Sequence, residues 1–236
     1  MKNNKHCGSE FPGMNEFSEV MVNVDEVRDA LKKFERNLKA GRVFFPGDAP
    51  FAMKCETLLK NAAHDIEGLS ASGRSFTATD KTLYTEDDQP KMVSVDEDDV
   101  IAVLDDTKKG LFGSLAKKEC SCGTIVTTKG ILVYRKGDDG NTWGSGFVTW
   151  PSIAVSPEYG EGCILFRAEG TLRGEGRGNF PHGPVICPSF LNMPTKRLSE
   201  SRDELGIHFV YIAQGKGAEF DYDDFCPEPA GELEED

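Results

Sequence analysis

Gly123-Thr-Ile-Val-Thr-Thr-Lys-Gly-Ile-Leu-Val-Tyr134 is the stretch of sequence that decides the fold class of this chain. It contains two short apolar runs rich in β-branched residues, and a polar turn that ends in Gly130 separates them. Such runs on either side of a glycine-containing turn predict two antiparallel strands. We place these strands near residues 124–128 and 131–136.

Similar apolar runs recur on both sides of this hairpin. They predict further strands near residues 100–104, 146–150, 163–168, 171–174 and 184–191, and glycine-rich turns separate most of them. Many short antiparallel strands at this spacing indicate a barrel or a sandwich.

The segment 194–213 follows these strands. Its apolar residues suit a helix that packs on one face: Leu198, Leu205, Phe209 and Ile212. The run 207–212 is also compatible with a strand, so both structures stay open for this segment.

Two helices are expected before the first strand. Residues 24–40 carry an apolar stripe at three- and four-residue spacing, and Asn23 with Glu26 resembles a capping box. Residues 50–67 form a second amphipathic segment, for which Asp48 is the expected N-cap. Because the loop between the two is short, an antiparallel helical hairpin is expected.

The net charge of the chain limits the classes of partner. It is −13 over 236 residues, and nine acidic residues lie between Glu219 and Asp236, where no Lys or Arg occurs. An acidic surface repels phosphates, so nucleic acid and anionic membranes are disfavoured as partners.

The cysteines and the N-terminal segment indicate the compartment. Seven cysteines occur without the dense spacing of a disulfide framework, and no apolar run is long enough for a signal peptide or a membrane span. We therefore expect a cytoplasmic protein with reduced thiols and no integral membrane contact.

Three motifs follow one another around the central hairpin. Val100-Ile-Ala-Val-Leu-Asp-Asp-Thr107 precedes it, Thr127-Thr-Lys-Gly130 forms its turn, and Gly146-Phe-Val-Thr-Trp150 follows it. In this order they resemble a group of bacterial pleckstrin-homology-like domains, over roughly residues 48–214. The resemblance implies an α+β fold: a seven-stranded antiparallel barrel or sandwich with a C-terminal helix. That group has no settled activity, so the resemblance implies a fold and no particular reaction.

The expected organisation has five parts. They are a disordered N-terminus (1–22), a helical hairpin (23–69), an acidic arm or insert (70–99), the pleckstrin-homology-like domain (100–214) and an acidic disordered tail (215–236). The arm, the sequence Cys120-Ser-Cys122 and the Gly- and Pro-rich stretch 172–188 depart from the resemblance.

None of the chemical motifs predicts a catalytic or metal site, and no cofactor is expected. Asp105 and Asp106 are adjacent in a strand and point to opposite faces, so a structural role at the strand end is the better interpretation. The pair Cys120 and Cys122 has the wrong spacing for a zinc knuckle, so plain turn cysteines are the better interpretation, with half a zinc site and a redox pair as the alternatives. The four histidines are scattered; His182 or His208 near carboxylates in a deep pocket would favour an enzyme.

Two groups of residues are candidates for binding. Trp143 lies in a polar turn, and three aromatics alternate with acids in the tail: Phe220, Tyr222 and Phe225. These four are candidate contacts for a protein or peptide partner. A small basic patch, made of Arg167, Arg173 and Arg177, is the candidate contact for an anion, and the acidic tail is expected to cover it in cis.

The sequence therefore favours a non-catalytic interaction module that binds a protein or peptide. A binder of small anions or lipid headgroups, acting through the Arg173 and Arg177 loop, is the first alternative. An enzyme with an unrecognised site is the second.

Overall fold

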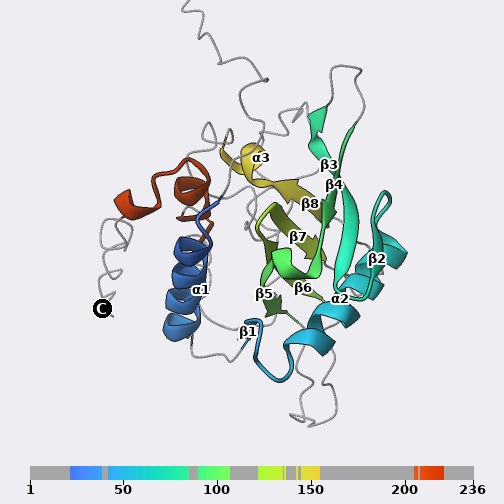
Figure 1. Cartoon of the computed structure of the whole chain (residues 1–236), viewed down its shortest axis with the longest axis horizontal. Helices are drawn as coiled ribbons and strands as arrows, with labels where there is room; N and C mark the ends of the chain where they lie inside the picture. The colour runs from blue at the N-terminus through green and yellow to red at the C-terminus, as the bar shows by residue number, and fades with distance from the viewer. Residues whose placement is uncertain are drawn as a thin grey trace, which may run out of the picture.

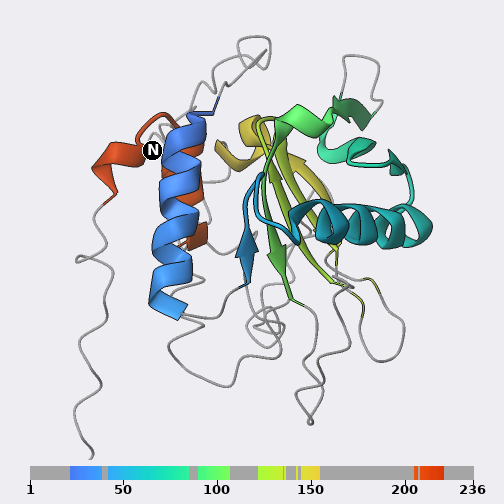
Figure 2. The same cartoon turned by 60° about the horizontal axis from the view of Figure 1, so that its bottom comes forward.

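A computed structural model describes residues 22–38, 42–84, 90–106, 122–134, 136, 142, 145–154, 205–206 and 208–220. These residues form one curled sheet with helices against both of its faces, as Figures 1 and 2 show.

Among the described residues the sheet has eight strands. Seven follow one another in the order β1-β5-β6-β7-β8-β3-β2, and β4 pairs with β3. Their bounds are β1 Val43–Phe44, β2 Ser70–Ser72, β3 Ser75–Tyr84, β4 Pro90–Val95, β5 Val100–Asp105, β6 Gly123–Thr127, β7 Gly130–Tyr134 and β8 Gly146–Thr149. The strands expected around residues 100–104, 124–128, 131–136 and 146–150 are therefore confirmed as β5 to β8, whereas those at 163–168, 171–174 and 184–191 lie outside the described residues.

The expectation of a purely antiparallel sheet is wrong. β3 and β8 are parallel neighbours, paired at Asp80 and Phe147. A parallel pair needs a long connection, and here β4 to β7 lie between the two strands in the chain. The curled sheet is thus mixed: β3–β8 is parallel, and the other strand pairs among the described residues are antiparallel.

The two faces of the central strands belong to two separate cores. On β7, Ile131 and Val133 join one core and Leu132 and Tyr134 join the other. This follows from the alternation of side chains along a strand. Strands buried on both faces have continuous apolar sequences, which explains the unbroken run Gly130–Tyr134.

A bulge in β5 modifies this alternation. The register of β5 against β6 shifts between Val100 and Ala102, and Ile101 and Ala102 consequently join the same core. An extra residue in one strand turns its successive side chains to one face. Val103 returns to the opposite core.

Helix α1 (Val24–Leu38) covers the outer face of the curl. Asn23 caps it as expected, because its Oδ1 accepts the backbone N–H of Asp25 at 3.1 Å and that of Glu26 at 3.4 Å. Its stripe of Val27, Leu31 and Phe34 is buried in the first core.

Helix α2 (Phe51–Asp65) lies on the inner side of the curl. Its Leu58 and Leu59 share the second core with Val95 of β4 and Val103 of β5, near both ends of the curl. Asp48 is not its N-cap, contrary to expectation, because Pro50 takes that position. The Asp48 carboxylate instead accepts the Phe45 backbone N–H at 2.7 Å and closes the preceding turn.

The expected helical hairpin is wrong. α1 and α2 belong to different cores on opposite faces of the sheet, as Figure 2 shows. The chain between them forms β1, which pairs with β5 at the edge of the sheet. A short loop therefore carries the chain past that edge rather than back along the first helix.

The segment 70–99 is part of the sheet and not a separate arm. β3 and β4 form a long hairpin, and Phe76, Ala78 and Val95 are buried in the second core. At the other end of the chain, residues 205–206 and 208–213 are helical and lie beside α1 (Figure 1). Leu205, Phe209 and Ile212 bury one face of this C-terminal helix, so the helical alternative is confirmed there.

Candidate functional site

Most of the residues that the sequence marks as binding contacts lie outside the described part of the chain. These are Trp143, Tyr222, Phe225, Arg167, Arg173 and Arg177, together with Cys120 and His182. The expected contact between the tail and the basic patch also involves residues outside the described part.

Phe220 is described, and it is buried against its own chain. It is 8% exposed, its ring stacks on His208 with centroids 4.6 Å apart, and Tyr211 meets it edge-on at 5.5 Å. In this conformation Phe220 therefore offers no surface to a partner. The start of the expected disordered tail, residues 215–220, instead packs beside α1, where a Cβ on Gly217 would lie 2.3 Å from the Glu26 carboxylate.

His208 is a packed histidine rather than a proton carrier. Burial, the largest cause, lowers its pKa to about 4, and the nearby charge of Lys33 lowers it further, whereas a hydrogen bond to the Gly217 backbone raises it. The imidazole is therefore neutral at pH 7.

Asp105, one of the two adjacent carboxylates, forms an ion pair with α2. The Lys54 ammonium lies 2.5 Å from its Oδ2, and both side chains are largely buried. The same ammonium lies 4.7 Å from the centroid of the Phe44 ring. Asp106 is buried and its backbone N–H bonds to the Cys122 carbonyl. These contacts agree with a structural role at the strand end.

The other end of α2 is held by a second polar cluster. Asp65 accepts hydrogen bonds from the Tyr134 hydroxyl, from Lys136 at 2.8 Å and from His64 at 2.6 Å. Bonds from Lys136, Tyr134 and His64 hold the pKa of Asp65 well below its usual range. Burial and then the bond to Asp65 raise the pKa of Tyr134, so the phenol stays protonated as a donor. The two clusters therefore hold the two ends of α2 against β5 and β7.

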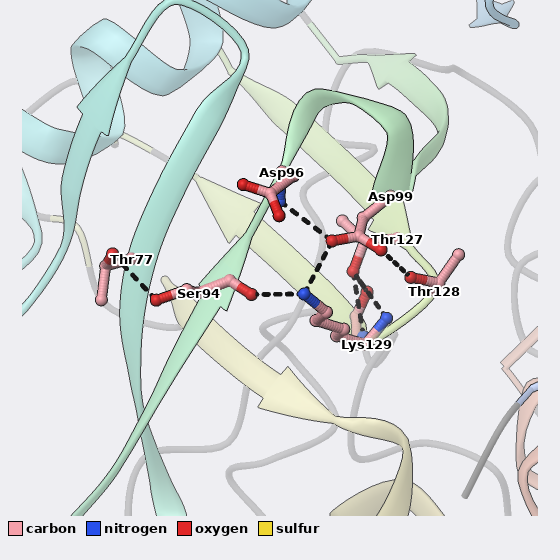
Figure 3. A network of polar contacts seen from close by, with 8 residues as sticks. Thr77, Ser94, Asp96, Asp99, Thr127, Thr128 and Lys129 are labelled. Carbon is pink, nitrogen blue, oxygen red and sulfur yellow. Dashed lines mark hydrogen bonds and ion pairs between the residues drawn. The ribbon is translucent and has the colours of Figure 1, made fainter. Parts of the chain in front are cut away.

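The motif Thr127-Thr-Lys-Gly130 forms a third polar network, drawn in Figure 3. Lys129 pairs with Asp99 at 2.8 Å and donates to the Ser94 carbonyl at 2.7 Å. Thr128 donates to the other oxygen of Asp99 at 2.6 Å. Burial alone would raise the pKa of Asp99, but these bonds and the Lys129 charge hold it below its ordinary value.

This network joins β4 to the turn between β6 and β7. Ser94 is on β4, Asp99 lies just before β5, and Lys129 is in the hairpin turn. Gly130 is required there, since a Cβ would lie 2.2 Å from the Val148 carbonyl of β8. The network therefore ties β4 and the start of β5 to the turn between β6 and β7.

The last motif residues also bond within the fold. The buried Asp80 carboxylate accepts both the backbone N–H of Thr149 at 2.9 Å and its hydroxyl at 2.6 Å. Trp150 donates from its indole to the Thr127 carbonyl. The described residues of all three motifs that carry the sequence resemblance thus supply structural contacts.

The surface that sequence reasoning missed is β4. Met92 on this strand is 62% exposed, one of two exposed large apolar residues in the described part of the chain. Within that part, β4 pairs only with β3. The alternation of Met92, Val93, Ser94 and Val95 was the available signal, but the acidic residues that follow led to the interpretation as an arm.

Reactive groups of other kinds are scarce in the described residues. Burial, the largest cause, raises the pKa of the Cys55 thiol to about 12, so this cysteine stays protonated. No three His, Cys, Asp or Glu side chains among the described residues are grouped to hold a metal ion.

None of the helices in the described part of the chain has the length and the apolar character that crossing a bilayer requires.

In comparisons with known proteins, no family model, curated protein or solved structure matches this chain.

Proposed function

We propose that this protein is a non-catalytic interaction module that binds a protein partner through β4. One observation carries the proposal: an apolar side chain, Met92, stands exposed on a strand that has only one sheet neighbour among the described residues. Exposed strands of this kind are recurrent docking sites for other chains.

The hydrogen bonds of three carboxylates support a binding role over a catalytic one. The carboxylates of Asp65, Asp80 and Asp99 each accept two or more hydrogen bonds from their own fold. A general acid or base needs a proton-transfer path to a substrate, and these groups are already engaged by structural donors.

The pleckstrin-homology-like plan and a cytoplasmic location belong to the same proposal. A curled sheet and a C-terminal helix support the plan. The parallel β3–β8 pair differs from its antiparallel barrel.

Site-specific photo-crosslinking in the native cells tests the binding role. A crosslinking residue replaces Met92, and a matched control replaces Asp29, whose side chain is 77% exposed on α1, on the outer face. We expect a defined protein adduct from position 92 that position 29 does not give. The same adducts from both positions, or none from position 92, would contradict the proposal.

A further inference from the structure

We infer that β4 binds its partner by strand addition, and that the partner supplies an extended segment with Lys or Arg at the end that meets the turn 96–99. This inference rests on the proposed function and adds to it the mode of binding and the chemistry of the partner.

The regular geometry of β4 carries the first part. Its register against β3 is continuous from the pair Phe76 and Val95 to the pair Asp80 and Lys91, and the irregularity lies beyond Asp80. Residues 91–95 therefore form an unbulged strand, about 17 Å long at the usual rise per residue. An added strand needs such a regular row of backbone donors and acceptors, since bulges stop pairing.

The side chains of β4 alternate as strand addition requires. Val95 is buried and Val93 partly buried in the second core, whereas Met92 and Ser94 are exposed on the opposite face. An added strand would continue both faces of the sheet. Every second residue of the added strand would then lie on the same face as Met92. An apolar residue opposite Met92 would cover its side chain.

The charge around the end of β4 carries the second part. Asp96, Glu97 and Asp98 follow the strand directly and all are exposed. Arg74 pairs with Glu97 at 2.7 Å, but the turn as a whole stays acidic. A Lys or Arg of the partner would be attracted to it, both by the turn and by the net charge of −13.

The same charges argue against a second copy of this chain as the occupant. Two copies paired along β4 would each contribute the acidic turn and a net charge of −13, so repulsion opposes their approach. A basic partner has no such penalty.

Lys129 limits where the added strand can bind. Its ammonium already donates a hydrogen bond to the Ser94 carbonyl oxygen. Lysines near edge strands are a common protection against unwanted strand pairing. An added strand that reaches Ser94 must therefore displace this donor, while Lys91 to Val93 need no such exchange. The partner cation can replace Lys129 beside the acidic turn.

Fluorescence anisotropy with the full chain and labelled synthetic peptides tests the inference. The probe is a heptapeptide of alternating Thr and Val with Lys at both ends. One control peptide has Glu in place of Lys. In two further control peptides every second backbone amide is N-methylated, so that one edge of the peptide strand is blocked in the first and the other edge in the second. The protein variants are Asp98→Lys in the acidic turn and, as a matched control, Asp29→Lys on α1.

We expect the Lys peptide to bind about tenfold more tightly than the Glu peptide, and N-methylation of one edge to abolish binding. Asp98→Lys should weaken binding of the Lys peptide about threefold or more, with Asp29→Lys close to wild type. Unweakened binding of both methylated peptides would overturn strand addition, and equal effects of the two variants would overturn the local role of the turn.

The outcomes for the two proposals are distinguishable. If no peptide binds while position 92 still gives its specific crosslink, the strand-addition inference fails and the interaction module stands. If the crosslink is also absent, both fail. Concentration-dependent self-association that Met92→Lys on β4 abolishes would instead identify a second copy as the occupant and overturn the basic partner.

Discussion

The indole Nε1 of Trp150 donates a hydrogen bond of 2.9 Å to the backbone carbonyl of Thr127. Trp150 follows β8 directly, and Thr127 is the last residue of β6, so this bond ties the two outer strands of a three-stranded unit together behind β7. The indole is fully buried and meets Phe209 of the C-terminal helix edge-on, with ring centroids 5.6 Å apart.

Trp150→Phe should destabilise the protein by about 1–3 kcal/mol. The substitution keeps an aromatic ring but leaves the buried Thr127 carbonyl without its donor and creates a small void. Chemical denaturation followed by far-UV circular dichroism measures the change. Tyr211→Phe is the matched control, because it keeps the ring that meets Phe220. An unchanged midpoint for Trp150→Phe would contradict the role of this bond.

The Asp99 network predicts an unequal effect of its two charged members. Asp99→Ala should cost about 2–3 kcal/mol, since it removes an acceptor used by Thr128, Lys129 and the Asp96 backbone. Lys129→Gln should cost less than about 1 kcal/mol, because the lysine is 40% exposed. Urea unfolding measures both.

The exposed neighbour Asp98 provides the control for this network. Asp98→Ala should stay within about 0.5 kcal/mol of wild type. If Asp99→Ala destabilised the protein no more than Asp98→Ala, the network between β4 and the β6–β7 turn would not contribute to the free energy of unfolding.

Asp65 should contribute stability that disappears in acid. Its pKa in the folded protein lies below the ordinary value of 3.8, so the unfolded chain takes up the proton first as the pH falls. The contribution is therefore complete above about pH 5 and is lost as the pH falls below 3.8 toward the folded-state value. Unfolding free energies of wild type and Asp65→Asn should differ at pH 7 and converge toward pH 2. A constant difference would be inconsistent with the depressed pKa.

His208 should also make stability depend on pH, in a higher window. Its pKa is about 4 in the folded protein against an ordinary 6.5, so the unfolded chain binds the proton first and stability falls as the pH drops from 6.5 toward 4. The limiting slope is about 1.4 kcal/mol for each pH unit. His208→Phe keeps an aromatic ring against Phe220 and should flatten this dependence.

His64→Gln is the matched control for the histidine experiment. The His64 side chain is 84% exposed, and replacing it should leave the dependence between pH 6.5 and 4 in place. Equal flattening by both variants would show that His208 is not the group responsible.

The sequence predicted the elements whose local patterns are strong. The β-branched runs on either side of Gly130 gave β6 and β7, and the apolar stripe of α1 with its Asn23 cap gave a helix close to its observed bounds. The C-terminal helix was one of two alternatives, and only its packing against α1 and the sheet selects it.

Local patterns could not show how these elements meet. The short loop after α1 suggested a hairpin, but pairing of β1 with β5 places the two helices on opposite faces. The parallel contact of β3 with β8 joins residues 67 positions apart, Asp80 and Phe147, and no local rule predicts such a pair.

What the sequence by itself determined is the central strands β5 to β8 and the two helices before them, because periodicity and capping depend on residues near each other in the chain. What only the tertiary structure decided is which side chains are left for function. In the folded chain Lys129 forms an ion pair with Asp99, Tyr134 donates a hydrogen bond to Asp65, and Phe220 stacks on His208. Met92 is left exposed on β4. Those outcomes depend on long-range packing, which brings together groups whose separation along the chain carries no signal of their contact.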